Sequence, residues 1–201
     1  MTLCLNAAPR PLTMADSTLL RRGDLVFNVA ADSKNVIVSS TAGNLRLATD
    51  HVAIVETSSD GVVIFEAIPE KGVTTTTWSD FVERAHDNGD DIVAARLRDA
   101  DNVDLTQAVD RARQLLGRPY DELFMLDTRQ IYCSELVQLS YIDKNGCHIF
   151  PLNPMNFTDA NGQILSYWRE RYERRGLWIP QGALGTNPAT IAASPLLQFI
   201  E

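Results

Sequence analysis

Runs of apolar residues, either continuous or alternating with polar ones, predict β-strands in the first half of the chain. Residues 23–29 form the first run, and residues 50–56 and 62–68 form a pair separated by the polar stretch 57–61. Ser, Asp and Gly in that stretch supply the local hydrogen bonds and backbone freedom of a tight turn. The pair is therefore predicted to be an antiparallel hairpin. A further strand is predicted at 92–97.

Helical spacing of apolar residues begins after the hairpin. Residues 104–116 place apolar side chains three or four positions apart, and Gly117 is suited to end that helix. Further helices are predicted at 78–86, 133–142 and 163–175. Strands followed by helices in this order indicate an α+β domain.

The length and composition fit a single folded unit. The chain has 201 residues, of which 45% are apolar and 22% charged, and a chain of this size buries enough surface for a core without metal or disulfide support. We expect one domain over residues 1–201. Within it, residues 1–20 are predicted to form a loose arm and residues 151–201 an irregular extension.

Charge and hydropathy narrow the range of partners. The chain has 18 basic and 26 acidic residues, a formal net charge of −8, and adjacent basic residues only in pairs, so no nucleic-acid partner is expected. No stretch approaches the roughly 18 apolar residues of a membrane span. The first ten residues lack the features of an export signal. We expect a cytoplasmic protein as the chain is written, or an extracytoplasmic one if a leader has been removed.

The three histidines and three cysteines limit the possible chemistry. His86 lies in a polar stretch, and His148 follows Cys147 without the additional ligands of a zinc site, so both are assigned structural roles. We expect no metal ion and no other cofactor. The odd cysteine count leaves two possibilities: either all thiols are reduced, or Cys4 and Cys147 form a bridge that leaves Cys133 free.

The predicted hairpin places a carboxylate near the third histidine. If the two strands pair about the bond between Ser58 and Ser59, His51 lies directly opposite Glu66 on the same face. A register shifted by one residue would place them on opposite faces. A carboxylate beside an imidazole can fix its tautomer and stabilise its protonated form. The alternative is a structural histidine that only hydrogen-bonds to a glutamate.

Cys133 is predicted to begin a helix that follows a loop. There a thiol experiences the positive end of the helix dipole and unpaired N–H groups, which favour the nucleophilic thiolate. A cysteine alone is more often a small buried apolar residue. Together with His51 and Glu66, however, it completes a set of nucleophile, base and orienting group. These residues indicate a cysteine hydrolase.

Five short motifs resemble those of the NlpC-type papain-like amidases. They are Gly-Asp-Leu-Val-Phe at 23–27, His-Val-Ala-Ile-Val at 51–55, Phe-Glu-Ala at 65–67, Leu-Gly-Arg-Pro-Tyr at 116–120 and Cys-Ser-Glu-Leu-Val at 133–137. In the ordinary family the cysteine motif comes first. Here the histidine and glutamate motifs precede it, which is similar to the permuted, YiiX-like branch. The resemblance covers roughly residues 20–142.

The resemblance implies a circularly permuted papain-like fold, in which a small antiparallel, barrel-like sheet packs against the Cys133 helix. It implies that Cys133 is the nucleophile, His51 the base and Glu66 the group that orients it, and that the Tyr120 hydroxyl helps to hold the oxyanion. The implied activity is cleavage of a peptide, isopeptide or N-acyl amide bond through a thioester. Glu66 and Glu135 depart from the family's usual residues, and Glu135 is expected to alter access to the nucleophile.

Other functions are compatible with the same residues. The substrate could be a peptide, a cell-wall fragment or an acyl lipid, since all carry an amide or ester bond. A lipid-directed acyltransferase or lipid amidase would use the same three residues. A binding module that kept the fold but not the activity would have an unactivated thiol. Four aromatic residues could line a groove for an apolar acyl chain, although ordinary packing is the commoner role. They are Trp168, Trp178, Tyr167 and Tyr172.

Overall fold

The computed structural model describes residues 8–30, 36–41, 47–100, 102–126, 129–159 and 161–201. Their centre is one six-stranded antiparallel sheet, with strand order β4-β3-β2-β1-β5-β8. The strands are β1 (Leu25–Val29), β2 (Thr49–Ser58), β3 (Gly61–Ile68), β4 (Gly72–Thr77), β5 (Asp91–Leu97) and β8 (Leu197–Phe199). Within the described residues the sheet is open rather than a closed barrel, because β4 and β8 are its edges.

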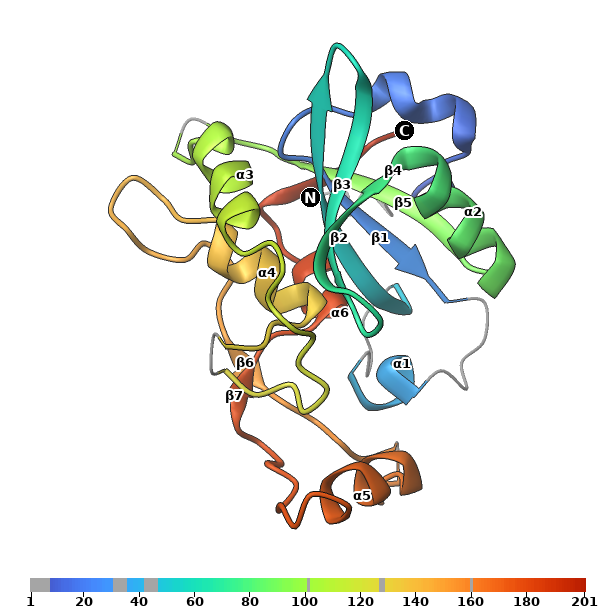
Figure 1. Ribbon diagram of the computed structural model, residues 1–201, viewed down its shortest axis with the longest axis vertical. Helices are drawn as coiled ribbons and strands as arrows, with labels where there is room; N and C mark the ends of the chain where they lie inside the picture. Colours follow the sequence, from blue (N-terminus) through green and yellow to red (C-terminus); the bar gives the residue numbers. More distant parts are fainter. Residues whose placement is uncertain (1–7, 31–35, 42–46, 101, 127–128, 160) are drawn as a thin grey trace, which may run out of the picture.

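Helices cover both faces of the sheet, with α3 and α4 on one side and α2 on the other (Figure 1). The helical elements are the 3-10 helix η1 (Met14–Leu19), α1 (Val36–Thr41), α2 (Trp78–Asn88), α3 (Leu105–Gln114), α4 (Cys133–Ser140), α5 (Ser166–Glu173) and α6 (Pro188–Ala192). A separate two-stranded ladder joins β6 (Asn153–Pro154) to β7 (Leu184–Gly185). The expected α+β class is confirmed. No helix in the described ranges is long and apolar enough to cross a membrane.

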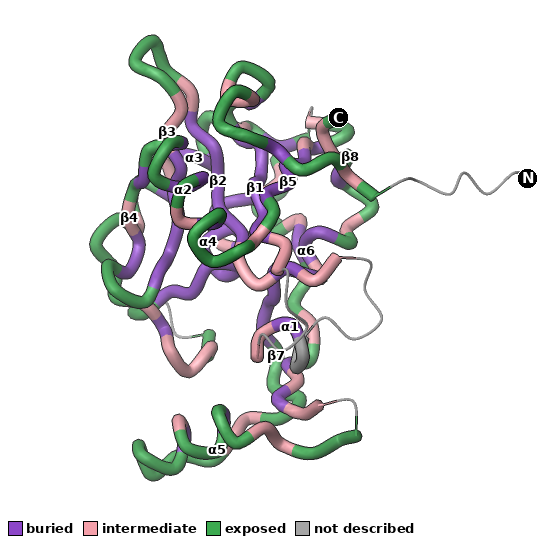
Figure 2. Tube along the Cα trace, turned by 90° about the vertical axis from the view of Figure 1, so that its right-hand side faces the viewer, coloured by how far each residue is buried: buried purple, intermediate pink, exposed green. Residues whose placement is uncertain are grey.

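Burial on both faces explains the continuous apolar runs of the central strands. Leu25 and Phe27 of β1 belong to the core shared with α3 and α4, whereas Val26 between them belongs to the core shared with α2. Successive side chains of a strand point to opposite faces, so a strand covered on both sides is apolar at every position. Figure 2 shows these strands buried along much of their length, whereas α5 is largely exposed.

The described parts of both terminal segments contain regular secondary structure. Of the expected loose arm 1–20, the described part contains η1, and the amide of Leu12 donates to the carbonyl of Ile92 on β5. The extension 151–201 contains α5, α6 and the edge strand β8. Hydrogen bonds to β5 hold these described segments against the sheet.

Strand β4 was not predicted, and it is the strand that fixes the loop before Tyr120. The amide of Val73 donates to the carbonyl of Arg118 (2.8 Å), and the amide of Gly117 donates to the carbonyl of Val73 (2.9 Å). A Cβ atom on Gly72 would lie 2.1 Å from the Arg118 carbonyl oxygen, and Gly72 has a φ of +68°. Only glycine fits such a close approach and such a backbone conformation.

We predict that Gly72→Ala destabilises the protein more than Gly89→Ala, which serves as the matched control. Gly89 has a similar φ of +78° but no heavy atom within 4 Å of a Cβ position, so its substitution carries only the left-handed backbone cost of about 1–2 kcal/mol. The clash at Gly72 adds about 1–3 kcal/mol. Urea unfolding measures the two free energies, and equal losses would contradict the close approach.

Candidate active site

His51 and Glu66 lie on the same face of the sheet, although they are not directly opposed. Ile54 pairs with Phe65, whereas the predicted register places Val63 opposite Ile54. The predicted register is therefore wrong by two residues. A shift of two leaves each side chain on its face, so Glu66 is diagonal to His51 and still within its reach.

The imidazole of His51 is held between a carboxylate and an aromatic ring. Its Nε2 lies 2.8 Å from Oε2 of Glu66. The ring of Phe81, on α2, lies 6.1 Å from the imidazole between centroids, at an interplanar angle of 31°. These contacts define the orientation of the imidazole, and they leave Nδ1 as the ring nitrogen that is free of the carboxylate.

The Glu66 carboxylate has no exposed surface and three hydrogen-bond donors. Oε1 accepts from the Thr76 hydroxyl on β4, and Oε2 accepts from Arg84 on α2 as well as from His51. Burial alone would raise the pKa of Glu66, but the hydrogen bonds and charges of His51 and Arg84 outweigh it and lower the pKa to about 2. The carboxylate is therefore ionised at neutral pH.

Cys133 is the first residue of α4 and is buried beside His51. The N-cap residue, Tyr132, contributes no side-chain cap to this helix, so the first N–H groups of α4 lie next to the sulfur without a side-chain acceptor from that residue. Burial would lower the pKa of His51, but hydrogen bonds to Cys133 and Glu66 raise it to about 10. The imidazole is thus protonated at neutral pH, with the cysteine on one side and the carboxylate on the other.

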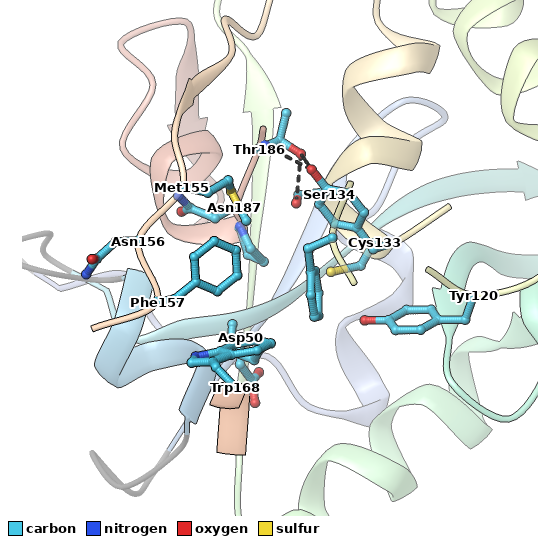
Figure 3. Close-up of a pocket in the computed structure, with 14 residues that line it drawn as sticks. Asp50, Tyr120, Cys133, Ser134, Met155, Asn156, Phe157, Trp168, Thr186 and Asn187 are labelled. Carbon is cyan, nitrogen blue, oxygen red and sulfur yellow. Dashed lines mark hydrogen bonds between the residues drawn. The ribbon is translucent and has the colours of Figure 1, made fainter. Parts of the chain in front are cut away.

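Tyr120 lies across the pocket from α4, with its hydroxyl directed into the pocket near Cys133 (Figure 3). Its loop is tied to the segment before α4, because the amide of Ile131 donates to the carbonyl of Pro119 (2.9 Å). Burial and the nearby Cys133 raise the pKa of Tyr120 well above its usual value. The hydroxyl is therefore a neutral donor, and it has no hydrogen-bond partner within the part of the chain that the structure describes.

A pocket opens beside the Cys133 sulfur, between α4 and the C-terminal segments (Figure 3). About 390 Å³ of space is free of protein atoms there, including the part that opens to solvent. It is lined by Ile37, Asp50, Tyr120, Phe124, Tyr132, Cys133, Ser134, Met155, Asn156, Phe157, Trp168, Thr186, Asn187 and Pro188. Sequence reasoning missed most of these residues. The one available signal was the density of aromatic residues between 150 and 178.

The other candidates from the sequence lie outside this site. His86 is exposed on α2, and Nδ1 of His148 is 2.8 Å from the Gln138 carbonyl oxygen, a structural contact. Cys147 is exposed and unpaired, and Cys4, its possible partner, lies outside the described residues. Glu135 is buried within α4 and does not line the pocket, so the structure gives no support to the expectation that it alters access to Cys133.

The order of these elements defines a class of protein. The histidine and glutamate strands precede a helix that begins with cysteine, which is a papain-like arrangement in permuted order. Residues 19–201 match the model of the Peptidase_C92 family, described as permuted papain-like amidase enzymes, YaeF/YiiX. The chain belongs to this family, and the fold that the sequence motifs implied is confirmed.

Two relatives from Escherichia coli support the assignment. The chain is 26% identical over 183 residues to the uncharacterized protein YiiX of strain K12, and the match covers 89% of this chain and 84% of that protein. The structure also resembles the crystal structure of the metalloprotein YiiX from strain O157:H7, with a TM-score of 0.68 and 17% identity. That match covers 90% of this chain and 96% of the other.

We predict that Glu66→Gln lowers the pKa of His51, because it removes the negative charge that stabilises the imidazolium. Titration of the His51 ring by NMR measures this pKa, with the exposed His86 as internal reference. Arg84→Gln is the contrasting variant. It retains the carboxylate and removes only the competing cation, so His51 should stay protonated at neutral pH. An unchanged pKa in Glu66→Gln would contradict the coupling.

The same pKa predicts how stability depends on pH. The pKa of His51 is raised in the folded protein from 6.5 to about 10. Protonation of His51 therefore stabilises the fold fully below about pH 6.5, and this contribution is lost as the pH rises through about 10. Urea unfolding at pH 6, 8 and 10 should show a smaller loss of stability for Glu66→Gln than for the unsubstituted protein.

Proposed function

We propose that the protein is a cysteine amidase that cleaves an amide bond through a thioester intermediate. The observation that carries this proposal is the position of His51, which hydrogen-bonds to Glu66 and lies close enough to Cys133 for the two groups to affect each other's charge. A base placed between a thiol and an orienting carboxylate is the arrangement that nucleophilic cysteine catalysis requires. Membership of a family of permuted papain-like amidases supports the same reaction class.

In the proposed mechanism, the Cys133 sulfur attacks the amide carbonyl carbon and a tetrahedral intermediate forms. The C–N bond then breaks, and His51 gives its proton to the leaving nitrogen. A water molecule next attacks the thioester while His51 takes a proton from it, and the C–S bond breaks to release a carboxylic acid. Glu66 keeps the imidazole oriented and stabilises its protonated form throughout.

Two donors are suited to the oxyanion that develops on the carbonyl oxygen. One is the backbone N–H of Cys133 at the start of α4, and the other is the Tyr120 hydroxyl, which points into the pocket (Figure 3). A neutral hydroxyl remains able to donate over the whole pH range of the reaction, and the direction of the Tyr120 pKa shift is consistent with that role.

No step of this mechanism uses a metal ion. The structurally similar YiiX from strain O157:H7 is described as a metalloprotein, which raises the question for this chain. The described residues contain no group of three or more His, Cys, Asp or Glu side chains that could hold a metal. The donors next to the pocket therefore do not fit a metal centre, and His51, Cys133 and Glu66 carry the proposed chemistry by themselves.

A second candidate function is acyl transfer to or from a lipid, which the mostly apolar lining of the pocket favours. In that case an added amine or alcohol acceptor would take the acyl group from Cys133 faster than water does. A binding module without turnover is the third possibility. It predicts a Cys133 thiol that reacts no faster than an exposed one.

We predict that iodoacetamide labels Cys133 selectively below pH 6. The positive charge of the His51 imidazolium lies beside the sulfur, and the thiolate that such a charge attracts is the form of cysteine that iodoacetamide alkylates. Mass spectrometry after labelling between pH 4 and 9 locates the modified residues, and exposed Cys147 in the same molecule is the reference. His51→Ala should remove the selectivity, whereas His86→Ala, on the surface of α2, should keep it. Equal rates for Cys133 and Cys147 would favour the binding module.

We predict that Tyr120→Phe lowers kcat/KM about 100-fold for any amide or ester that the protein hydrolyses, because one oxyanion donor is lost. Cys133→Ala should abolish turnover entirely. Alkylation by iodoacetamide displaces iodide and forms no oxyanion, so its rate at Cys133 should be unchanged in Tyr120→Phe. A parallel fall in both rates would show instead that Tyr120 holds the site together structurally.

A further inference from the structure

The pocket beside Cys133 presents an apolar surface although several polar residues line it. The Tyr132 hydroxyl accepts from the amide of Thr186 (3.0 Å), and the Thr186 hydroxyl donates to that of Ser134 (3.0 Å). Asn187 accepts from the amide of Thr190 at the start of α6. These contacts engage the hydroxyls and the Asn187 side-chain oxygen within the protein, so those atoms provide little binding for a polar ligand.

A fifth polar side chain in the wall, that of Asn156, is engaged in the same way. The side-chain oxygen of Asn156 accepts from the Thr158 hydroxyl (2.8 Å) and from the side-chain amide of Gln181 (2.9 Å). Asp50 also lines the pocket with its carboxylate, whereas the rest of the wall is largely aliphatic or aromatic, with contributions from Ile37, Phe124, Met155, Phe157, Trp168 and Pro188. A ligand in the pocket therefore gains free energy mainly by removing apolar surface from water.

The position of His51 indicates which part of a substrate enters this pocket. His51 does not line it, yet His51 must reach the leaving nitrogen in order to protonate it. The leaving group therefore lies on the His51 side of the sulfur. The group that occupies the pocket is the one that stays on Cys133 as the acyl part of the thioester.

Phe124 forms a wall of the pocket and has an unusual backbone. Its φ is +55°, which is the left-handed region and is costly for a bulky residue. The Asp121 carboxylate stabilises this turn by accepting from the amides of Leu123 (2.8 Å) and Met125 (2.5 Å). A backbone that is held in this way indicates that the direction of the Phe124 side chain matters.

The ring of Phe124 lies between two other aromatic residues of the pocket wall. It lies 6.2 Å from the ring of Tyr120 and 5.4 Å from that of Trp168, between centroids, and is edge-on to both. Tyr120 marks the end of the pocket near the proposed oxyanion, and Trp168 marks the end away from α4. The ring therefore occupies space into which a longer acyl chain would extend.

We propose that this pocket binds an apolar acyl group of the substrate and that Phe124 limits the length of that group. The proposal rests on the proposed function, because it assigns the pocket to the acyl side of the reaction at Cys133. It gives the substrate class as amides whose carbonyl carries a short aliphatic or aromatic group, and it makes Phe124 a residue that determines specificity.

The test uses alkylation of Cys133, which does not require hydrolysis. Bromomethyl ketones, R–CO–CH2Br with R from methyl to octyl, place R where the acyl group lies; the cysteine sulfur displaces bromide and forms one C–S bond. The ratio of the Cys133 rate to the rate of exposed Cys147 removes the intrinsic reactivity of each reagent. We expect this ratio to rise about twofold to fourfold for each added methylene, and then to stop rising once the pocket is filled.

Two variants test the role of Phe124. Phe124→Ala and Phe124→Gly both remove the ring, and the glycine variant also tolerates the left-handed backbone. In both, the ratio should keep rising to longer chains than in the unsubstituted protein. Met125→Ala is the matched control, because Met125 lies in the same turn, is exposed and does not line the pocket. It should leave the profile unchanged.

The outcomes separate this proposal from the proposed function. A ratio that does not depend on chain length, or a Cys133 that no ketone labels, overturns the acyl pocket. If the rate ratio stops rising at the same chain length with and without the Phe124 ring, Phe124 does not limit the length of the acyl group. If the profile rises as expected while iodoacetamide shows an ordinary thiol at Cys133, the pocket stands and the amidase mechanism fails.

Discussion

An ionised carboxylate with no contact to solvent is tolerated only when hydrogen bonds replace the water it has lost. For Glu66 those bonds come from Thr76 on β4, Arg84 on α2 and His51 on β2. One buried charge therefore determines how three elements meet on one face of the sheet. The orientation of the imidazole follows from this constraint. A rotation of His51 would leave the Glu66 carboxylate with one donor fewer and would separate the His51 imidazolium from its carboxylate.

The second half of the site depends on backbone pairing. Val73 at the start of β4 pairs with Arg118, and Ile131 pairs with Pro119, so Tyr120 lies on a short stretch that is held at both ends. The same edge strand, β4, provides the Thr76 hydroxyl to Glu66. The edge strand β4 thus holds the loop of Tyr120 on one side of Cys133 and supports the Glu66 partner of His51 on the other. The positions of these side chains therefore depend on the pairing of the sheet.

The sequence predicted elements correctly where burial of one face gives the apolar residues of a strand or helix a regular spacing. The hairpin strands, helix α3 and the shared face of His51 and Glu66 were predictable because sheet and helix packing repeat at fixed spacing. Strand β4 was missed because its run of threonines has no apolar alternation. The hairpin register was missed because the turn is centred on the bond between Ser59 and Asp60, and the polar residues 57–61 do not distinguish this centre from the one a residue earlier. The pocket walls, such as Phe157 and Trp168, come from distant segments whose contacts follow no local period.

The permuted order also has a consequence for synthesis. A ribosome releases the N-terminal strands first, and folding can begin on that part of the chain. The strands that carry His51 and Glu66 therefore emerge before Cys133, and the pocket wall is complete only after Pro188 has left the ribosome. In terms of the proposed mechanism, a nascent chain accordingly holds the base before the nucleophile, and then the nucleophile before the acyl pocket is complete. Under the proposed function, the segment that carries Pro188 is made after Cys133 and adds the acyl pocket to the site.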